Sequence, residues 1–224
     1  MSIGENLNSI KKEIGNNVNL IAVSKTKPIE DIEKAYNLGI RDFGENKVQE
    51  LVEKVEQFEK KDVNWHLIGH LQRNKVKYIV GKVHLIHSLD SIRLLKEIEK
   101  RYKEEDKIAK LLIQINIGED ENKYGIKEEQ LEDMIAACEK CNNIKVEGLM
   151  AVLPMEDSET CRKYFEEMRK IFDNLKSKSF KNIQMKYLSM GMSGDYKIAI
   201  EEGANMVRIG QGIFGKRDYN NNNL

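Results

Sequence analysis

The sequence shows no excess of either charge and no long hydrophobic run. Lysine plus arginine and aspartate plus glutamate number 37 each in 224 residues. Balanced charge gives no electrostatic basis for binding nucleic acid or a membrane surface. No apolar stretch approaches the roughly 20 residues that a membrane-spanning helix needs, and residues 1–15 show no signal-peptide pattern. We therefore expect a soluble, cytoplasmic protein whose partners include neither nucleic acid nor a membrane.

Cysteine and histidine are also scarce, with three and four residues. Cys138 and Cys141 form a C-x-x-C pair, but a zinc site needs about four ligands, and neither a second cysteine pair nor a nearby histidine pair is present. The pair falls late in an amphipathic segment, away from a helix start that would stabilise a thiolate. We interpret the cysteines as reduced, partly buried thiols. The histidines are interpreted as structural, so no metal site is expected.

Nucleotide-binding signatures are missing as well. The chain has neither a Walker-type lysine loop nor a complete G-x-G-x-x-G after its first apolar run, which argues against nucleotide binding.

Short apolar runs alternate with longer amphipathic segments along the chain. The runs have the length and flanking turns of buried parallel strands. They comprise residues 19–24, 42–44, 65–69, 84–88, 111–117, 145–152, 185–190 and 206–210. The segments between them predict helices at residues 29–38, 45–58, 73–80, 91–103, 127–140 and 158–175, and a last one that Ser193 caps, with Asp195 in its first turn, ending near residue 202.

Eight strands that alternate with helices predict an α/β fold, a single (β/α)8 TIM barrel. An open doubly wound sheet is the rival, because alternation alone does not separate the two, but the number of strands favours the barrel. No linker or change of composition divides the chain. We expect one domain over residues 1–224, with a frayed polar tail at about 219–224.

Two glycine-rich turns follow the seventh and eighth runs. One run ends at Ser189-Met190-Gly191 and the other at Arg208-Ile209-Gly210. Glycine leaves backbone N–H groups open to an anion, and barrels commonly bind phosphate on the loops after strands seven and eight. Either turn alone would be read as a tight turn; the two together predict a phosphate site.

Lys25 stands at the end of the first run and is expected at the same mouth, since strand eight adjoins strand one in a closed barrel. An amine that is partly desolvated there favours its neutral, nucleophilic form. A Schiff base with pyridoxal phosphate requires an amine beside a phosphate-binding site. Lys27 competes for this role, but strand alternation places it in the loop next to Pro28.

Seven motifs occur in an order that closely resembles the pyridoxal phosphate homeostasis protein family. They are AVSKTKP from Ala22, FGEN from Phe43, WHLIGHLQRNK from Trp65, HSLDS from His87, GLMAV from Gly148, LSMGMSGDY from Leu188 and VRIGQGIFGKRDY from Val207. The resemblance spans residues 22–219. It implies the barrel of the alanine racemase N-terminal domain.

The resemblance also implies site residues. Pyridoxal 5'-phosphate would form a covalent aldimine at Lys25, with Asn46 near the cofactor face. Ser189 would contact the phosphate with Met190 and Ser193 adjacent, and Gly210 and Gln211 would offer backbone N–H groups. Arg208 would face the pyridine nitrogen. Many members carry Ser or Thr where this chain has Gln211.

Two functions remain open at this point. One is a non-catalytic protein that holds the cofactor and contributes to vitamin B6 homeostasis, with pyridoxal-phosphate-dependent apo-enzymes as candidate recipients. The other is an amino-acid racemase of low activity. Racemisation needs two acid/base groups, and in the racemases the second comes from a further domain that we do not expect here. Arg208 would leave the ring nitrogen unprotonated and the ring a weaker electron sink. Both points favour the carrier, and a monomer is expected.

Overall fold

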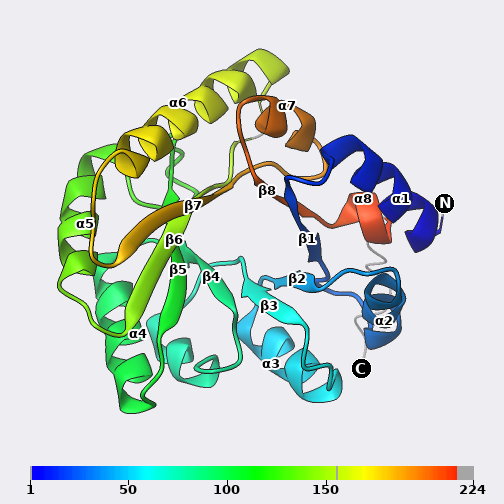
Figure 1. Ribbon diagram of the computed structural model, residues 1–224, viewed down its shortest axis with the longest axis horizontal. Helices are drawn as coiled ribbons and strands as arrows, with labels where there is room; N and C mark the ends of the chain where they lie inside the picture. The colour runs from blue at the N-terminus through cyan, green and yellow to red at the C-terminus, as the bar shows by residue number, and fades with distance from the viewer. Residues whose placement is uncertain (1, 155, 216–224) are drawn as a thin grey trace.

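The computed structural model describes residues 2–154 and 156–215, so the tail expected at about 219–224 lies outside the described residues, as does Met155. Strands and helices alternate along the described chain (Figure 1). The strands are β1 (Asn19–Val23), β2 (Asp42–Glu45), β3 (Asn64–Leu67), β4 (Leu85–Leu89), β5 (Ala109–Ile115), β6 (Ile144–Ala151), β7 (Ile183–Ser189) and β8 (Met206–Ile209).

The strands form a closed, fully parallel barrel in chain order. β1 pairs with β2, where Ala22 lies opposite Phe43, and also with β8, where Ile21 lies opposite Arg208. This closure confirms the predicted (β/α)8 barrel and excludes the open sheet. It also brings the loops after β1 and β8 to the same end of the ring.

Helices surround the ring of strands (Figure 1). They are α1 (Ile3–Ile14), α2 (Ile29–Asn37), α3 (Val48–Gln57), α4 (Ile92–Glu104), α5 (Leu131–Glu139), α6 (Ser158–Lys176), α7 (Tyr196–Glu201) and α8 (Gln211–Phe214), with 3-10 turns η1 (Arg73–Tyr78) and η2 (Glu128–Gln130). No helix in the described ranges has the length and apolar character to cross a membrane.

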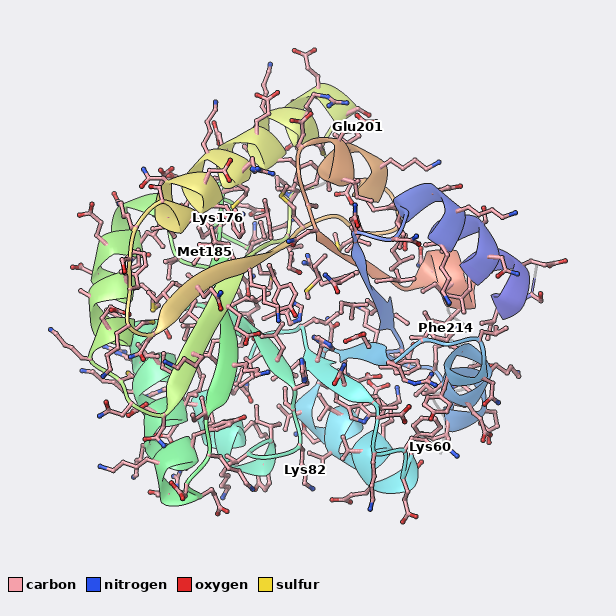
Figure 2. All side chains as sticks on the ribbon, viewed as in Figure 1. Lys60, Lys82, Lys176, Met185, Glu201 and Phe214 are labelled. Carbon is pink, nitrogen blue, oxygen red and sulfur yellow. The ribbon has the colours of Figure 1, made fainter. Side chains whose placement is uncertain are left out.

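Two apolar clusters pack the protein. The larger lies between the strands and the helices, where Phe43 and Phe165 are fully buried. The smaller contains Ile21, Leu112 and Met150, and belongs to the interior of the ring, which side chains fill (Figure 2). Such a filled interior leaves the strand ends as the place for a ligand site.

Helix α1 was not predicted. Ser2 begins it with a capping box, in which its hydroxyl accepts from the Glu5 N–H while the Glu5 carboxylate accepts from the Ser2 N–H. Leu7, Ile10 and Ile14 form its buried face. Their helical spacing is the signal that would have revealed it.

The predicted cap at Ser193 is wrong. Helix α7 begins at Tyr196, and Asp195 occupies the N-cap position with its carboxylate accepting from the Met192 N–H at 2.6 Å. Asp195 therefore closes the turn that precedes the helix, while Ser193 Oγ accepts from the Gly212 N–H at 3.3 Å. The serine thus joins the two glycine-rich turns. The helix predicted at residues 73–80 is the shorter 3-10 turn η1.

Candidate functional site

A cavity of about 750 Å³ opens at the carboxyl ends of the strands. Its wall combines the ends of β1, β2, β3, β6 and β8 with the loops after β7 and β8. The lining residues are Val23, Lys25, Lys27, Asn46, Ile68, Val152, Leu153, Pro154, Glu156, Cys161, Met192, Ser193, Gly194, Asp195, Arg208, Gly210, Gln211 and Gly215. The wall is apolar on the side of Val152, Leu153 and Pro154, and polar on the side of the glycine-rich turns.

Lys25 enters this cavity from the end of β1 and is half-buried. The turn that carries it is held on both sides. The Ser24 N–H donates to the Gly44 carbonyl at 3.0 Å, and the Thr26 N–H donates to Glu50 Oε1 at 2.5 Å. Thr26 has a φ of 63°, a conformation that a threonine adopts only under such restraint. Lys25 is therefore presented by a braced turn.

Lys27 lies in the loop after β1, as expected, and it also lines the same cavity. Its ammonium donates to the Phe214 carbonyl at 3.1 Å. The structure thus brings both lysines to the cavity, and Lys27 ties the loop after β1 to helix α8.

A buried ion pair lies beneath the Lys25 turn. Lys54 Nζ lies 2.8 Å from Glu45 Oε1 and 2.7 Å from Glu50 Oε1, and it donates to the Ser24 carbonyl at 2.7 Å. Burial raises the pKa of Glu45 to about 7, against the opposing effect of Lys54 and Ser24. Sequence reasoning missed this group, although Glu50 and Lys54 stand four residues apart on α3, a spacing that pairs charges on one helix face.

The glycine-rich turns present unbonded backbone donors. Within the described residues, the N–H groups of Ser193, Gly194 and Gln211 have no hydrogen-bond acceptor. The first turn depends on Gly191, whose φ is +93° and where an added Cβ would lie 2.7 Å from the Ala199 Cβ. Three free N–H groups on two adjacent turns form a concave wall suited to an anion.

Arg208 projects from β8 and is 4% exposed. Its Nη1 donates to the Ser189 carbonyl at 2.9 Å and to Ser189 Oγ at 2.6 Å, and its Nη2 donates to the Ala151 carbonyl at 2.7 Å. Burial lowers the pKa of Arg208 to about 10, which leaves it protonated at neutral pH. Three of its five N–H bonds are used in this way, so the remaining donors can serve a ligand in the cavity.

His66, His70 and His87 form hydrogen bonds with neighbouring side chains, and the three cysteines are buried. His66 bonds with Asp42 and His87, and His70 bonds with Asp90. Across the described ranges, no group of three or more His, Cys, Asp or Glu residues could hold a metal ion. Cys138 and Cys141 are buried free thiols, and burial raises their pKa values to about 12 and about 11.

Comparison with known proteins identifies the family to which this chain is similar. Residues 1–218 match the family model of the alanine racemase N-terminal domain. A pyridoxal phosphate homeostasis protein of Aquifex aeolicus is 45% identical over 201 residues, which cover 89% of this chain and 87% of that protein. The chain belongs to the pyridoxal phosphate homeostasis protein family. The relative of that name from Escherichia coli K12 is 39% identical over 207 residues, covering 90% of this chain and 87% of its own.

Solved structures agree with membership of the homeostasis protein family. PipY of Synechococcus elongatus PCC7942 is 33% identical, and the match covers 96% of this chain and all of PipY. Its TM-score is 0.90 for the structure without pyridoxal phosphate and 0.88 for the structure with it bound. An alanine racemase of Clostridium difficile 630, at 18% identity and a TM-score of 0.77, shares the fold over 98% of this chain and 57% of its own.

Most of the residues expected from the homeostasis protein family meet at one cavity. The lining includes Lys25, Asn46, Ser193, Arg208, Gly210 and Gln211. Ser189 and Met190 are instead fully buried behind this wall. Ser189 bonds with Arg208, and the Met190 N–H donates to the Met206 carbonyl; neither side chain belongs to the lining of the cavity.

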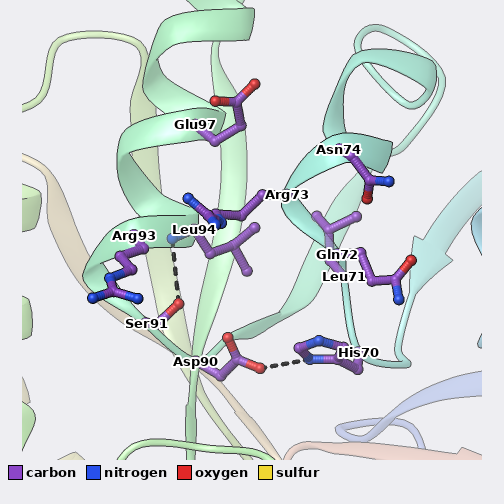
Figure 3. A pocket seen from close by; sticks show the side chains of 10 residues that line it. All are labelled: His70, Leu71, Gln72, Arg73, Asn74, Asp90, Ser91, Arg93, Leu94 and Glu97. Carbon is purple, nitrogen blue, oxygen red and sulfur yellow. Dashed lines mark hydrogen bonds and ion pairs between the residues drawn. The ribbon is translucent and has the colours of Figure 1, made fainter.

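A second cavity, of about 580 Å³, lies between η1 and the start of α4 (Figure 3). His70 bonds with Asp90 at 2.8 Å on its floor, and the His70 ring stacks on Tyr124 with their centroids 3.8 Å apart. Tyr124 is thereby held against the loop after β3. Sequence reasoning did not foresee this cavity.

Proposed function

We propose that this protein holds pyridoxal 5'-phosphate in the 750 Å³ cavity, covalently linked to Lys25, and contributes to vitamin B6 homeostasis without turning over a substrate. The observation that carries the proposal is that three kinds of functional group line the same cavity. A half-buried amine, a set of unbonded N–H groups and a protonated guanidinium lie around the same space. They match the aldehyde, the phosphate and the ring nitrogen of this cofactor.

Each part of the wall has a separate task in this proposal. Lys25 would supply the nucleophilic amine. Ser193, Gly194 and Gln211 would bind the phosphate through their N–H groups, so the glutamine in place of a hydroxyl residue would still contribute its backbone. Asn46 has a buried side-chain oxygen, Oδ1, without a hydrogen-bond partner, which a ligand donor could satisfy.

The same wall favours a carrier over a racemase. The cofactor supplies an electron sink that is strongest when its ring nitrogen is protonated. Arg208 offers only donors, so it would keep that nitrogen unprotonated and the sink weak. Racemisation also needs a second acid/base group on the face opposite Lys25. We infer that bound cofactor is stored and released, with apo-enzymes that use it as recipients, by a monomeric protein.

The test is borohydride reduction of the protein mixed with pyridoxal phosphate, followed by peptide mapping. The label should be on Lys25 and should vanish in Lys25→Ala, whereas the matched Lys27→Ala variant keeps it. A label on Lys27, or none, would refute the site. Incubation with either alanine enantiomer should show no steady racemisation; robust turnover would establish the racemase instead. Light scattering tests the monomer, and reactivation of an apo-enzyme tests delivery.

A further inference from the structure

A row of hydrogen-bonded side chains crosses the inside of the barrel from β8 to β2. Arg208 Nη1 lies 2.6 Å from Ser189 Oγ, and Ser189 Oγ lies 3.3 Å from His87 Nδ1. His87 Nε2 lies 2.9 Å from His66 Nδ1, and His66 Nε2 lies 2.9 Å from Asp42 Oδ1. Five strands, β8, β7, β4, β3 and β2, each contribute one member.

The row connects a buried cation to a solvent-accessible anion. Arg208, Ser189, His87 and His66 are each at most 4% exposed, whereas the Asp42 side chain is 35% exposed. The bonds that Arg208 makes within the described chain all go to neutral acceptors, Ser189 and Ala151. A buried cation is costly without a compensating charge. The row therefore supplies a bonded route from Arg208 to a carboxylate.

The chemistry of the groups sets one direction for every hydrogen bond. Burial raises the pKa of Asp42, but hydrogen bonds from His66 and Asn64 outweigh this and lower it, so Asp42 accepts from His66 Nε2–H. His66 then accepts at Nδ1 from His87 Nε2–H, the direction that the buried Ser189 hydroxyl at the other end of the row requires. Burial lowers the pKa of His87 well below its usual value, so His87 is neutral and accepts at Nδ1 from the Ser189 hydroxyl.

The opposite direction fails at its last step. If His66 donated to His87 and His87 to Ser189, the Ser189 hydroxyl hydrogen would have to find another acceptor. Arg208 has none to offer, because a guanidinium only donates. Ser189 is fully buried, and the described residues offer its hydroxyl no acceptor other than His87, so its hydrogen would remain unsatisfied. The arrangement that leaves Arg208 as the first donor and Asp42 as the last acceptor satisfies all five groups.

We propose that Ser189, His87, His66 and Asp42 are positioning residues for Arg208, joined in a one-way hydrogen-bond chain that holds the guanidinium toward the cavity. The effect on the cofactor rests on the proposed function, whereas the hydrogen-bond chain from Arg208 to Asp42 does not depend on that function. Ser189 is kept as an acceptor, which fixes Nη1 and leaves other N–H groups of Arg208 for the ligand. Asp42, at the far end of the barrel, thereby acts on the cofactor pocket without touching it.

The first experiment needs neither cofactor nor variant. Nitrogen-15 NMR of the imidazole rings in the ligand-free protein reports which ring nitrogens carry a proton. We expect both His87 and His66 to carry it on Nε2 alone. A His87 protonated on Nδ1, or a doubly protonated His66, would reverse the chain and overturn the proposal.

The second experiment compares Asp42→Asn with Asp62→Asn. Asp62, in the segment just before β3, is an exposed acid that pairs with Arg41. Asp62→Asn therefore removes the same charge but no member of the hydrogen-bond chain. In the ligand-free protein, Asp42→Asn should speed hydrogen exchange of the Arg208 guanidinium and shift the His87 nitrogens, while Asp62→Asn changes neither. Equal behaviour of the two variants would overturn the proposal. A thermal melt accompanies both variants.

The third readout adds pyridoxal phosphate. Asp42→Asn should weaken its binding about 3- to 10-fold, because one charge-assisted bond is weakened, and shift the visible absorption band; Asp62→Asn should do neither. An unchanged affinity and spectrum in Asp42→Asn would refute the positioning role. Wild-type protein that fails to label at Lys25 would refute the proposed function alone, since the imidazole and exchange measurements judge the chain without ligand.

Discussion

Replacing Lys54 by methionine isolates a buried cation that holds the Lys25 turn in place. Lys54 and Glu45 have side-chain exposures of 8% and 0%, and their charged atoms lie 2.8 Å apart. The same ammonium also bonds with the Ser24 carbonyl and with Glu50, which in turn accepts from the Thr26 N–H. Lys54→Met therefore removes the bond to the Ser24 carbonyl and the cation that holds Glu50 beside Thr26, and it leaves Glu45 without its cation.

The cost of this change depends on whether Glu45 carries a charge. Burial raises the pKa of Glu45 to about 7 from its usual 4.5, so between these values the folded protein binds more protons than the unfolded chain. The contribution of Glu45 to stability is therefore fully present at low pH and is lost as the pH rises from 4.5 to about 7. Without Lys54 the pKa of Glu45 rises further, and this loss continues above pH 7.

The magnitude follows from the width of that window. At pH 6, Glu45 is largely protonated in both proteins, so Lys54→Met should cost about 1–3 kcal/mol through lost hydrogen bonds. At pH 8.5, about 1.5 pH units above the wild-type pKa, ionisation of Glu45 remains favourable only with Lys54 present. Each pH unit is worth about 1.4 kcal/mol, so the deficit should grow by about 2 kcal/mol.

Urea denaturation at the two pH values measures this difference, with the fluorescence of Trp65, the one tryptophan of the chain, as the probe. The matched control compares the Lys54→Met, Glu45→Gln double variant with Glu45→Gln alone, because the titrating group is absent from both and their difference in stability should be the same at both pH values. Borohydride labelling of Lys25 should fall in Lys54→Met. A deficit of equal size at pH 6 and pH 8.5 would refute this account of the ion pair.

Three further outcomes are expected. Gly69→Ala should lower the free energy of unfolding in urea by about 1–3 kcal/mol, because the added Cβ would lie 2.3 Å from the Asn46 carbonyl oxygen. Gly194→Ala is the control, because its Cβ would point into open space, and its effect should stay within about 0.5 kcal/mol. Equal effects of the two substitutions would contradict the packing around Gly69. Cys138, whose pKa burial raises to about 12, should resist iodoacetamide at pH 7.5 until urea unfolds the protein, and rapid labelling of native protein would place it elsewhere. Below pH 6.5 the unfolded chain protonates His87 while the fold keeps it neutral, so stability should fall by up to about 1.4 kcal/mol per pH unit, and His87→Gln should lessen that slope.

The barrel could be predicted because its strands are local patterns. Each apolar run was bounded by turn residues, and the strands of the structure begin and end within two residues of the predicted runs. Local signals also misled. Ser193 looked like a cap because it precedes a helical segment with Asp195 in its first turn, yet Asp195 takes that place because its carboxylate reaches the Met192 N–H. Helix α1 was missed although Leu7 and Ile14 share one face.

The candidate site was predicted as a set of residues and not as an arrangement. The motifs pointed to Ser189 and Arg208, but Ser189 also contacts His87, 102 residues earlier in the chain. No local spacing encodes a contact between strands that meet only when the ring closes. Likewise, Lys54 reaches the Ser24 carbonyl from 30 residues away. Motifs name such residues, and topology alone decides which of them touch.

Strand β2 shows how one short segment serves both buried cations. Its first residue, Asp42, ends the chain of hydrogen bonds from Arg208, and its last residue, Glu45, pairs with Lys54. Between them, Gly44 lies where a Cβ would come within 2.9 Å of Ile21 in the ring interior. The carboxylate at the start of the strand is linked to Arg208 through the row of hydrogen bonds, and the carboxylate at its end pairs with the cation beneath the Lys25 turn. The DFGE sequence is thus explained by the electrostatics of the barrel interior, and its polar residues are as constrained as any apolar residue of the core.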